Sequence, residues 1–227
     1  MLASAIIPAA GSGKRFGEKK QLKELSGRPL IHYTLTPFLE SSAIAEIVIA
    51  AQKKDFDKLA SVVDSIATEK KISIIEGGDT RQGSISNALA QINSNTEYVC
   101  VHDAARPFVS SELIEKLINA LKTCDAVTVG RKSTDTLKEC TNGIVRRTID
   151  RKKIWQVQTP QAFTKEVIMN AYELAEKQNI LATDDSSLVE EAGYQVNIIN
   201  DSSINFKITT KEDWIMAEAI LRFKKNV

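Results

Sequence analysis

The 227-residue chain contains only two histidines and three cysteines, and this scarcity excludes several kinds of active site. His32 and His102 have no Ser/His/Asp grouping around them, as a hydrolase triad would require. The cysteines show neither CxxC spacing nor any other metal-ligand spacing, so a zinc site is not expected. Their small and odd number predicts a reducing compartment.

Long apolar runs and an excess of charge of one sign are absent as well. No run approaches the roughly 18 residues of a membrane span, and the N-terminal segment lacks the basic stretch of a signal peptide. We therefore expect a cytoplasmic protein with no membrane partner. Thirty basic and 29 acidic side chains give a formal net charge of +1, whereas nucleic-acid binders are usually strongly basic. A nucleic-acid partner is not expected.

What the sequence does contain is a regular alternation of apolar and amphipathic stretches. The apolar stretches predict strands over residues 2–9, 44–51, 71–76, 97–102, 126–130 and 195–199. The amphipathic stretches predict helices near residues 29–40, 54–68, 80–92, 110–122, 165–178, 184–192 and 210–224. Apolar strands separated by helices indicate a mostly parallel sheet covered on both faces. The expected fold class is α/β, with a Rossmann-like, doubly wound sheet.

Local signals place several helix starts. Pro29 suits the first position of a helix, and Ser110 or Ser111 can cap the fourth helix. Thr209 and Glu212 have the spacing of a capping box. Because the chain shows no repeat, low-complexity segment or linker, we expect it to form a single domain.

The alternation is interrupted between about residues 132 and 162. Two segments, Thr136–Cys140 and Ile144–Ile149, flank Asn142-Gly143, which is the preferred pair for a tight two-residue hairpin turn. We therefore expect a β-arm at about residues 132–160 that protrudes from the main sheet.

A loop containing glycines directly follows the first predicted strand. Residues 9–17 read AAGSGKRFG. Ligands of parallel α/β sheets bind beyond the carboxyl ends of the strands, and glycines let backbone N–H groups approach phosphate oxygens. The dinucleotide fingerprint fails here, because it needs a glycine where Phe16 stands and an acid near Tyr33. No glycine pair in this loop has the P-loop spacing either, so dehydrogenases of the Rossmann type and P-loop kinases are not supported.

Basic side chains crowd this loop, namely Lys14, Arg15, Lys19, Lys20 and Lys23. One interpretation is a solvated basic surface loop. The position of these residues just after a Gly-x-Gly turn favours another interpretation, a triphosphate site. Nucleotidyl transfer builds negative charge on the α-phosphate and on the departing pyrophosphate, and fixed cations stabilise that charge.

Asp103 follows the predicted strand at residues 97–102. An aspartate at such a point commonly holds Mg²⁺, which binds few protein carboxylates together with substrate phosphates. A turn or a helix cap is the alternative. Arg106, three residues later, can pair with Asp103 or reach a phosphate. We expect a structural hydrogen bond from His102 and a packing role for His32.

Six segments of the chain together resemble one enzyme family. They are PAAGSGKRFGEKKQ (8–21), GGDTRQGSISNAL (77–89), VHDAARP (101–107), DRKKIWQVQTPQAF (150–163), ATDDSSLVEEAG (182–193) and NFKIT (205–209). Their order and content resemble the 2-C-methyl-D-erythritol 4-phosphate cytidylyltransferases of the non-mevalonate isoprenoid pathway. The resemblance extends from residue 3 to about residue 220.

The resemblance implies a reaction and its residues. The phosphate of 2-C-methyl-D-erythritol 4-phosphate would attack the α-phosphorus of CTP with Mg²⁺ present, giving 4-diphosphocytidyl-2-C-methyl-D-erythritol and pyrophosphate. Arg15 and Lys20 match the catalytic cations, and Asp103 matches the metal-linked aspartate. The residues that match the nucleotide site are Ala10, Gly11, Ser12, Gly13, Gly78, Asp79, Arg81, Ser84, Asp103 and Ala104. The residues that match the second-substrate site are Arg106, Thr136, Arg151, Thr159, Thr183 and Lys207.

The resemblance also implies a homodimer. In the family the β-arms interlock, so that each arm helps to complete the site of the other subunit. The hairpin over residues 136–149 would be this arm.

Three positions depart from the family pattern. Lys19 stands where proline is frequent, which leaves Lys19 and Lys20 as adjacent candidates, and we choose Lys20 because it precedes Gln21. Gly83 stands where an acid is frequent. Asn205 lies near the point where related sugar nucleotidyltransferases can have a second metal-binding acid, which argues against two-carboxylate coordination.

Two alternatives have different activities. Ribitol-5-phosphate cytidylyltransferases share the fold and the chemistry, but they more often show Ala-Gly-Gly in the first loop and His-Asp-Ala-Val-Arg-Pro after the fourth strand. Ala10 and Ala105, together with Asp150-Arg151 and Trp155, favour the methylerythritol enzymes. A nucleotide-binding regulator without turnover is the other alternative, and it would not need cations for a second substrate.

Overall fold

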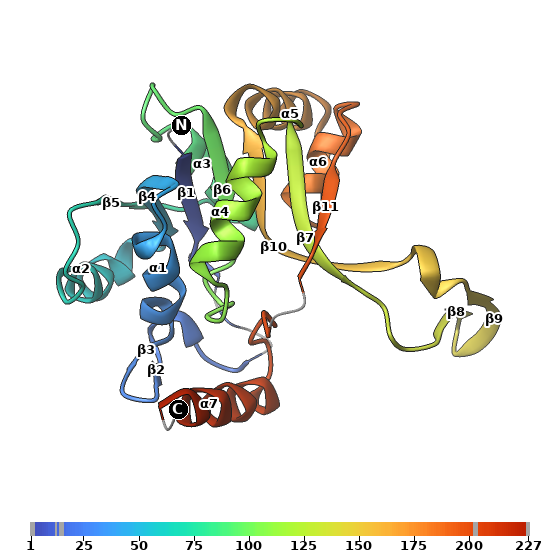
Figure 1. The fold of residues 1–227 in the computed structure, drawn as a ribbon, viewed down its shortest axis with the longest axis horizontal. Helices are drawn as coiled ribbons and strands as arrows, with labels where there is room; N and C mark the ends of the chain where they lie inside the picture. Colours follow the sequence, from blue (N-terminus) through green and yellow to red (C-terminus); the bar gives the residue numbers. More distant parts are fainter. Residues whose placement is uncertain (1–2, 12, 14–15, 202–203, 226–227) are drawn as a thin grey trace.

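The computed structural model describes residues 3–11, 13, 16–201 and 204–225. Its central feature is a seven-stranded sheet in the order β11-β7-β10-β6-β1-β4-β5 (Figure 1). The strands are β1 (Ala3–Pro8), β4 (Ile44–Ala51), β5 (Lys71–Glu76), β6 (Tyr98–Val101), β7 (Ala126–Lys132), β10 (Trp155–Thr164) and β11 (Asn197–Asn200). Neighbouring strands pair in parallel except at β10, which is antiparallel to both β6 and β7. The expected α/β class with a mostly parallel sheet is confirmed.

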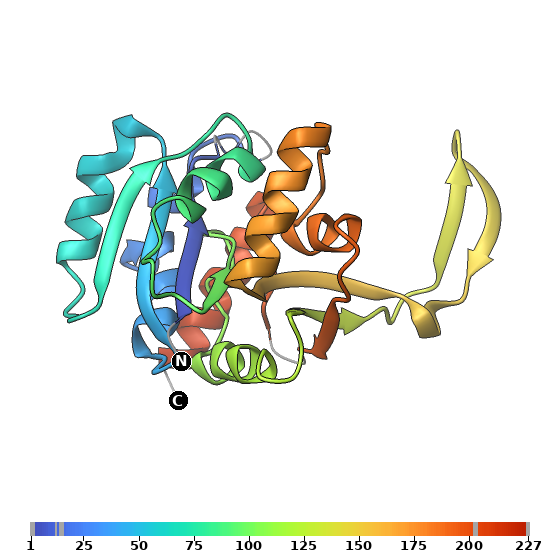
Figure 2. The same cartoon turned by 90° about the horizontal axis from the view of Figure 1, so that it is seen from above.

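Helices cover both faces of the sheet. One face packs against α1 (Leu30–Glu40), α2 (Phe56–Asp64) and α4 (Ser111–Ala120), and the other against α3 (Arg81–Leu89), α5 (Lys165–Gln178) and α6 (Asp185–Glu191). Figure 2 shows α4 and α5 on opposite sides of the sheet. On β1, Ile6 belongs to one apolar cluster and Ile7 to the other, which explains why this strand is apolar without alternation. Among the described residues, no helix has the length and apolar character to cross a membrane.

A third apolar cluster joins α7 (Lys211–Lys225) to the segment that follows the glycine loop. Phe16 packs against Trp214 with 5.4 Å between the ring centroids. The short strands β2 (Glu24–Leu25) and β3 (Arg28–Pro29) lie in the same region, and Leu25 is fully buried there. Just before α7, the backbone N–H of Ile208 donates to the carbonyl of Ala105 at 2.8 Å. The segment carrying Lys207 is thereby held beside the loop after β6.

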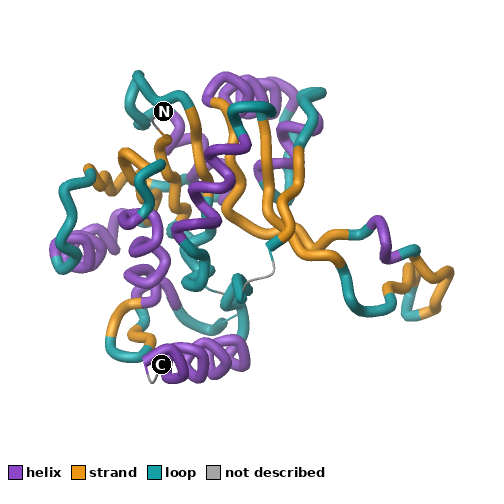
Figure 3. The backbone as a smooth tube through the Cα atoms, in the orientation of Figure 1, coloured by secondary structure: helices purple, strands orange, loops and turns teal. Residues whose placement is uncertain are grey.

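The expected β-arm is present. Strands β8 (Leu137–Thr141) and β9 (Ile144–Ile149) form a separate two-stranded sheet, followed by the 3-10 helix η3 (Arg151–Lys153). Asn142 and Gly143 have φ values of 51° and 78°, the positive values that a primed hairpin turn requires. Figures 1 and 3 show this arm extending away from the helices and the main sheet.

The structure differs from the sequence expectations at several points. The long strand β10 was not predicted, and α2 is shorter than expected at both ends, with η2 (Lys53–Asp55) in place of its predicted start. Pro29 ends β3 and occupies the N-cap position immediately before α1, so it does not form part of the first helical turn. The predicted capping box of Thr209 and Glu212 is wrong by one residue. Asp213 accepts the N–H of Thr210 at 2.8 Å, and the Asp213 N–H donates to Thr210 Oγ1 at 3.3 Å.

Candidate functional site

The site lies where the sheet order changes direction. From β1 the chain proceeds to β4 and β5 on one side, and β6 then returns to the other side of β1. Loops at the carboxyl ends of these strands enclose a cavity of about 600 Å³, a size typical of small-molecule sites. The lining includes Ala10, Gly11, Gly13, Lys20, Gln21, Gln52, Gly78, Asp79, Arg81, Ser84, Asp103, Ala104 and Lys207. Ser12 and Arg15, both predicted from the sequence, lie outside the described residues.

Backbone geometry explains the glycines of the first loop. Gly13 has a φ of 72°, and a Cβ at this position would clash with the carbonyl oxygen of Glu18. Gln21 donates from Nε2 to the carbonyl of Gly11 at 3.0 Å, which fixes the start of the loop against η1 (Lys20–Leu22). Gly11 and Gly13 therefore present only backbone to the cavity, as binding of phosphate oxygens requires.

The two adjacent lysines have different surroundings. Lys19 pairs with Asp55 and donates to Gln52 Oε1 at 3.1 Å, so its ammonium group binds to the loop after β4. Lys20 lines the cavity and is 8% exposed. The sequence-based choice of Lys20 as the cation facing the substrate is consistent with this placement.

The opposite wall of the cavity is built at the start of α3. Thr80 caps this helix by accepting the N–H of Gly83 at 2.9 Å, and Ser84 donates to the carbonyl of Thr80 at 2.8 Å. Gly78 packs so closely that a Cβ would lie 2.8 Å from the carbonyl carbon of Gly83. Asp79, which stands between Gly78 and Thr80 in the chain, also lines the cavity.

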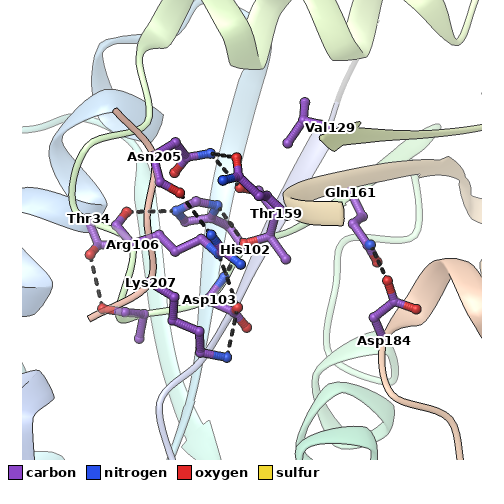
Figure 4. Close-up of polar contacts among 12 residues, drawn as sticks. Thr34, His102, Asp103, Arg106, Val129, Thr159, Gln161, Asp184, Asn205 and Lys207 are labelled. Atoms are coloured by element: carbon purple, nitrogen blue, oxygen red, sulfur yellow. Dashed lines mark hydrogen bonds and ion pairs between the residues drawn. The ribbon is translucent and has the colours of Figure 1, made fainter. Parts of the chain in front are cut away.

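Asp103 is surrounded by three cations, of which Arg106 and Lys207 are labelled in Figure 4. Its Oδ2 lies 2.9 Å from Lys207 Nζ and 3.4 Å from Arg106 Nε, and its Oδ1 lies 3.3 Å from Arg81 Nε. Burial alone would raise the pKa of this carboxyl, but the charges of Lys207, Arg81 and Arg106 outweigh burial and hold the pKa well below its usual range. Asp103 is therefore ionised at neutral pH.

A chain of hydrogen bonds supports Asp103 from behind. The Asp103 N–H donates to Thr159 Oγ1 at 3.0 Å, Thr159 Oγ1 lies 3.1 Å from His102 Nδ1, and His102 Nε2 lies 3.0 Å from the carbonyl of Arg106. A carbonyl only accepts, so the proton of the neutral imidazole is on Nε2, and the Thr159 hydroxyl donates to Nδ1. Burial lowers the pKa of His102 to about 4, so the ring is neutral. The structural role expected for His102 is confirmed.

The surroundings of Asp103 allow a test of the expected Mg²⁺ site. The described residues contain no group of three or more His, Cys, Asp and Glu side chains that could hold a metal ion. The ionised carboxylate of Asp103 has about four acceptor positions, and three basic side chains contact it. One carboxylate fits Mg²⁺ in the coordination where substrate phosphates and water supply the other ligands. Asn205 does not line the cavity: its side-chain amide donates to the Thr159 carbonyl at 2.9 Å, and its backbone carbonyl accepts from Arg106 Nη1 at 2.8 Å.

The predicted second-substrate residues do not come together in one chain. Lys207 lines the cavity, whereas Arg106 and Thr159 lie behind it. Thr183 is exposed just before α6. Thr136 and Arg151 are exposed on the arm, where Arg151 donates to the carbonyl of Thr134. Their roles in substrate binding stay predictions.

Some residues that shape the site were not singled out from the sequence. Gln52 follows β4 and lines the cavity. Gln21 lines it as well, although in the sequence it served only to decide between Lys19 and Lys20. Asp185 accepts a hydrogen bond directly from Arg81, and Tyr172 is linked to Arg81 through its own hydrogen bond to Asp185. An aspartate in the first turn of a helix ordinarily indicates a favourable charge at the helix start, so the sequence offered no signal for this contact.

Comparisons with known proteins identify the family of the chain. The family model of 2-C-methyl-D-erythritol 4-phosphate cytidylyltransferase matches residues 3–223. A relative of that name from Clostridioides difficile is 40% identical over 98% of this chain and 95% of its own, and one from Halalkalibacterium halodurans is 38% identical over 98% of both chains.

Solved structures give the same result. The 4-diphosphocytidyl-2C-methyl-D-erythritol synthase of Anaerococcus prevotii matches with a TM-score of 0.87 and 36% identity, over 97% of this chain and 98% of its own. The 2-C-methyl-D-erythritol 4-phosphate cytidylyltransferase of Thermus thermophilus matches with a TM-score of 0.80 and 31% identity, over 98% of this chain and 100% of its own. The family model, the relatives and the solved structures together show that the chain belongs to the 2-C-methyl-D-erythritol 4-phosphate cytidylyltransferase family.

Proposed function

We propose that this enzyme transfers CMP from CTP to 2-C-methyl-D-erythritol 4-phosphate, releasing pyrophosphate, as a step of non-mevalonate isoprenoid synthesis. The observation that carries the proposal is the position of Lys20, Asp103 and Lys207 around one cavity at the switch point of the sheet. A nucleotide site needs a glycine loop and fixed cations, and a second phosphorylated substrate needs a further cation within reach of the same cavity.

The proposed chemistry is an in-line displacement. A phosphate oxygen of the polyol attacks the α-phosphorus of CTP, the bond to the bridging oxygen breaks, and pyrophosphate leaves with the electron pair. Lys20 and Arg15 stabilise the negative charge that develops on the α-phosphate. Lys207 holds the phosphate of the polyol, and Asp103 keeps Lys207 in place through their 2.9 Å ion pair. Mg²⁺ bound beside Asp103 would supply further charge neutralisation for the triphosphate.

The arm supports a proposal of homodimerisation. Ile144 and Val145 at its tip are 62% and 54% exposed. An isolated two-stranded hairpin is marginally stable in water, so a hairpin with exposed apolar side chains is expected to pack against another surface. We propose that this surface belongs to a second copy of the chain, and that Thr136 and Arg151 complete the polyol site of that copy.

The remaining features of the proposal concern organisation and location. Residues 1–227 would form a single nucleotidyltransferase domain with the arm at about 132–160, because one continuous sheet includes strands from β1 to β11. A cytoplasmic location is supported by the three free thiols of the chain, which a reducing compartment preserves.

The deciding experiment measures pyrophosphate release from CTP and Mg²⁺ with three additions: 2-C-methyl-D-erythritol 4-phosphate, ribitol 5-phosphate, or neither. Release only with the first is the expected result. Release with ribitol 5-phosphate alone would transfer the assignment to that substrate. Binding of CTP without release under any of the three conditions would indicate a regulator.

A further inference from the structure

Asp185 is a fully buried carboxylate in the first turn of α6 that touches the site without lining it. Its Oδ2 accepts a hydrogen bond from Arg81 Nη2 at 2.7 Å, and its Oδ1 accepts one from the hydroxyl of Tyr172 at 2.6 Å. Tyr172 lies on α5 and is itself buried. Two helices thus combine to present one negative charge to an arginine of the nucleotide cavity.

Capping of the helix does not explain this side chain. Asp184, not Asp185, caps α6, because Asp184 Oδ1 accepts the N–H of Ser187 at 3.0 Å. The Asp185 N–H donates to Gln161 Oε1 at 3.1 Å, a bond that any non-proline residue would make through its backbone. Burying a carboxylate is unfavourable unless it is paired and hydrogen-bonded. The partner that compensates the charge of Asp185 is Arg81.

Arg81 bridges two carboxylates that come from different parts of the chain. Its Nε faces Asp103 on the loop after β6, and its Nη2 faces Asp185 on α6. Burial opposes the charge of Arg81, but Asp185 and Asp103 outweigh burial and raise its pKa. The guanidinium is thus held at two of its nitrogens, by Asp103 at Nε and by Asp185 at Nη2. Without Asp185, the Nη2 end would lose its ion pair while the contact of Nε with Asp103 remained.

We propose that Asp185, oriented by the hydroxyl of Tyr172, is a positioning residue that fixes the guanidinium of Arg81 in the wall of the CTP site. This inference rests on the proposed function, since it takes CTP as the ligand of the cavity. It assigns a role in nucleotide binding to a helix that does not line the cavity.

The test is direct calorimetric titration of CTP with Mg²⁺ into the full-length enzyme, without polyol, so that no turnover occurs. Asp185→Asn removes the charge and is expected to weaken CTP binding about tenfold to a hundredfold, the effect of losing a charge-assisted hydrogen bond. Tyr172→Phe leaves the carboxylate in place and is expected to weaken binding about threefold to tenfold. In steady-state kinetics, KM for CTP rises in both variants while KM for the polyol phosphate changes little.

The direction of the change separates positioning from simple electrostatics. Replacing an aspartate by asparagine removes a negative charge near an anionic ligand, so a purely electrostatic role predicts tighter CTP binding. Positioning predicts weaker binding. In an Arg81→Gln background, Asp185→Asn should add no further loss, because its effect passes through Arg81.

Glu46 offers a matched control at the other end of the sheet. It is also a buried carboxylate, accepting from Ser4 Oγ and from the Asn93 N–H, each at 2.6 Å. Glu46→Gln should lower the melting temperature without changing CTP affinity.

Unchanged or tighter CTP binding in Asp185→Asn, or additive losses with Arg81→Gln, would overturn the proposal. If Asp185→Asn does not fold, Tyr172→Phe decides alone, and wild-type affinity in that variant would overturn it. A wild-type enzyme that binds CTP but releases no pyrophosphate removes the proposed function while the affinities still test Asp185. A wild-type enzyme that does not bind CTP overturns both.

Discussion

The surroundings of Asp103 and the β-arm both carry residues proposed to bind substrate, but they hold them in opposite ways. Around Asp103, charged side chains from α3, from the loop after β6 and from the segment before α7 meet within 3.4 Å. On the arm, Arg151 and Thr136 are exposed, and the ion pair of Arg147 with Glu139 is solvated as well.

This difference indicates which of the proposed substrate contacts a single chain holds in place before a ligand binds. Fixed charges in a partly buried site need little rearrangement when a ligand binds, whereas exposed side chains lose conformational freedom at that moment. Under the proposed function, a single copy would hold the nucleotide side of the site and Lys207 in fixed positions, while the polyol contacts of the arm would still be unfinished. The following predictions test this division, in order of decreasing effect.

The largest effect is expected at Lys20. Lys20→Ala should lower kcat by about 10²–10³-fold, the scale for losing one preorganised donor to the transition state. Lys19→Ala is the matched control: its ammonium group pairs with Asp55, so we expect a loss of less than about fivefold, as for one partly exposed ion pair. Steady-state kinetics of both variants gives the answer, and a larger loss in Lys19→Ala would reverse their roles.

The next effect concerns the arm. If Arg151 acts across the dimer, Lys20→Ala and Arg151→Ala chains are each nearly inactive but complement one another. A mixture that exchanges subunits freely should regain about a quarter of wild-type activity, because half of the dimers are mixed and each has one intact site.

Verified mixed dimers that stay inactive would contradict the shared site. Their formation is checked by differently tagged chains. A mixture of two Lys20→Ala preparations, treated in the same way, is the control for activity regained without complementation.

The smallest effect belongs to the buried layer behind Asp103. The pKa of His102 is lowered from 6.5 to about 4, so between these values the unfolded chain binds a proton that the folded chain does not. The free energy of unfolding therefore falls as the pH drops through this window, by up to about 3 kcal/mol from this group. Denaturant unfolding should show a smaller acid-induced loss in His102→Gln than in wild type. His32→Gln, a change outside this layer, should keep most of the loss.

Much of the fold could be predicted because it follows from local patterns. The strand at 44–51 and the helix at 165–178 have the predicted bounds, since each combines a clear period with clear ends. Strand β10 was missed because glutamines, threonines and Pro160 dilute its apolar pattern, and its pairing depends on β6 and β7, which are distant in sequence. The hydrophobic pattern of a segment does not reveal a strand whose burial comes from the neighbouring strands of the sheet.

The site was predictable to the extent that its residues share short segments. Most of the nucleotide-site residues expected from the glycine loop, from 77–89 and from 101–107 line the cavity. The contact of Arg81 with Asp185 joins residues 104 positions apart, and no local pattern marks it. Lys20 was chosen over Lys19 only because it precedes Gln21; the ion pair of Lys19 with Asp55, which distinguishes the two lysines in the structure, joins residues 36 positions apart.

The course of β10 has a mechanical consequence. Strand β7 leads into the arm and β10 leads out of it, and the two strands pair antiparallel from Lys132 and Trp155 inward. A pull on the arm would load both strands along their axes at once, and would strain in shear the hydrogen bonds that join this pair to β6 and to β11. Force on the arm would therefore reach the strand that carries Thr159, whose Oγ1 accepts the N–H of Asp103.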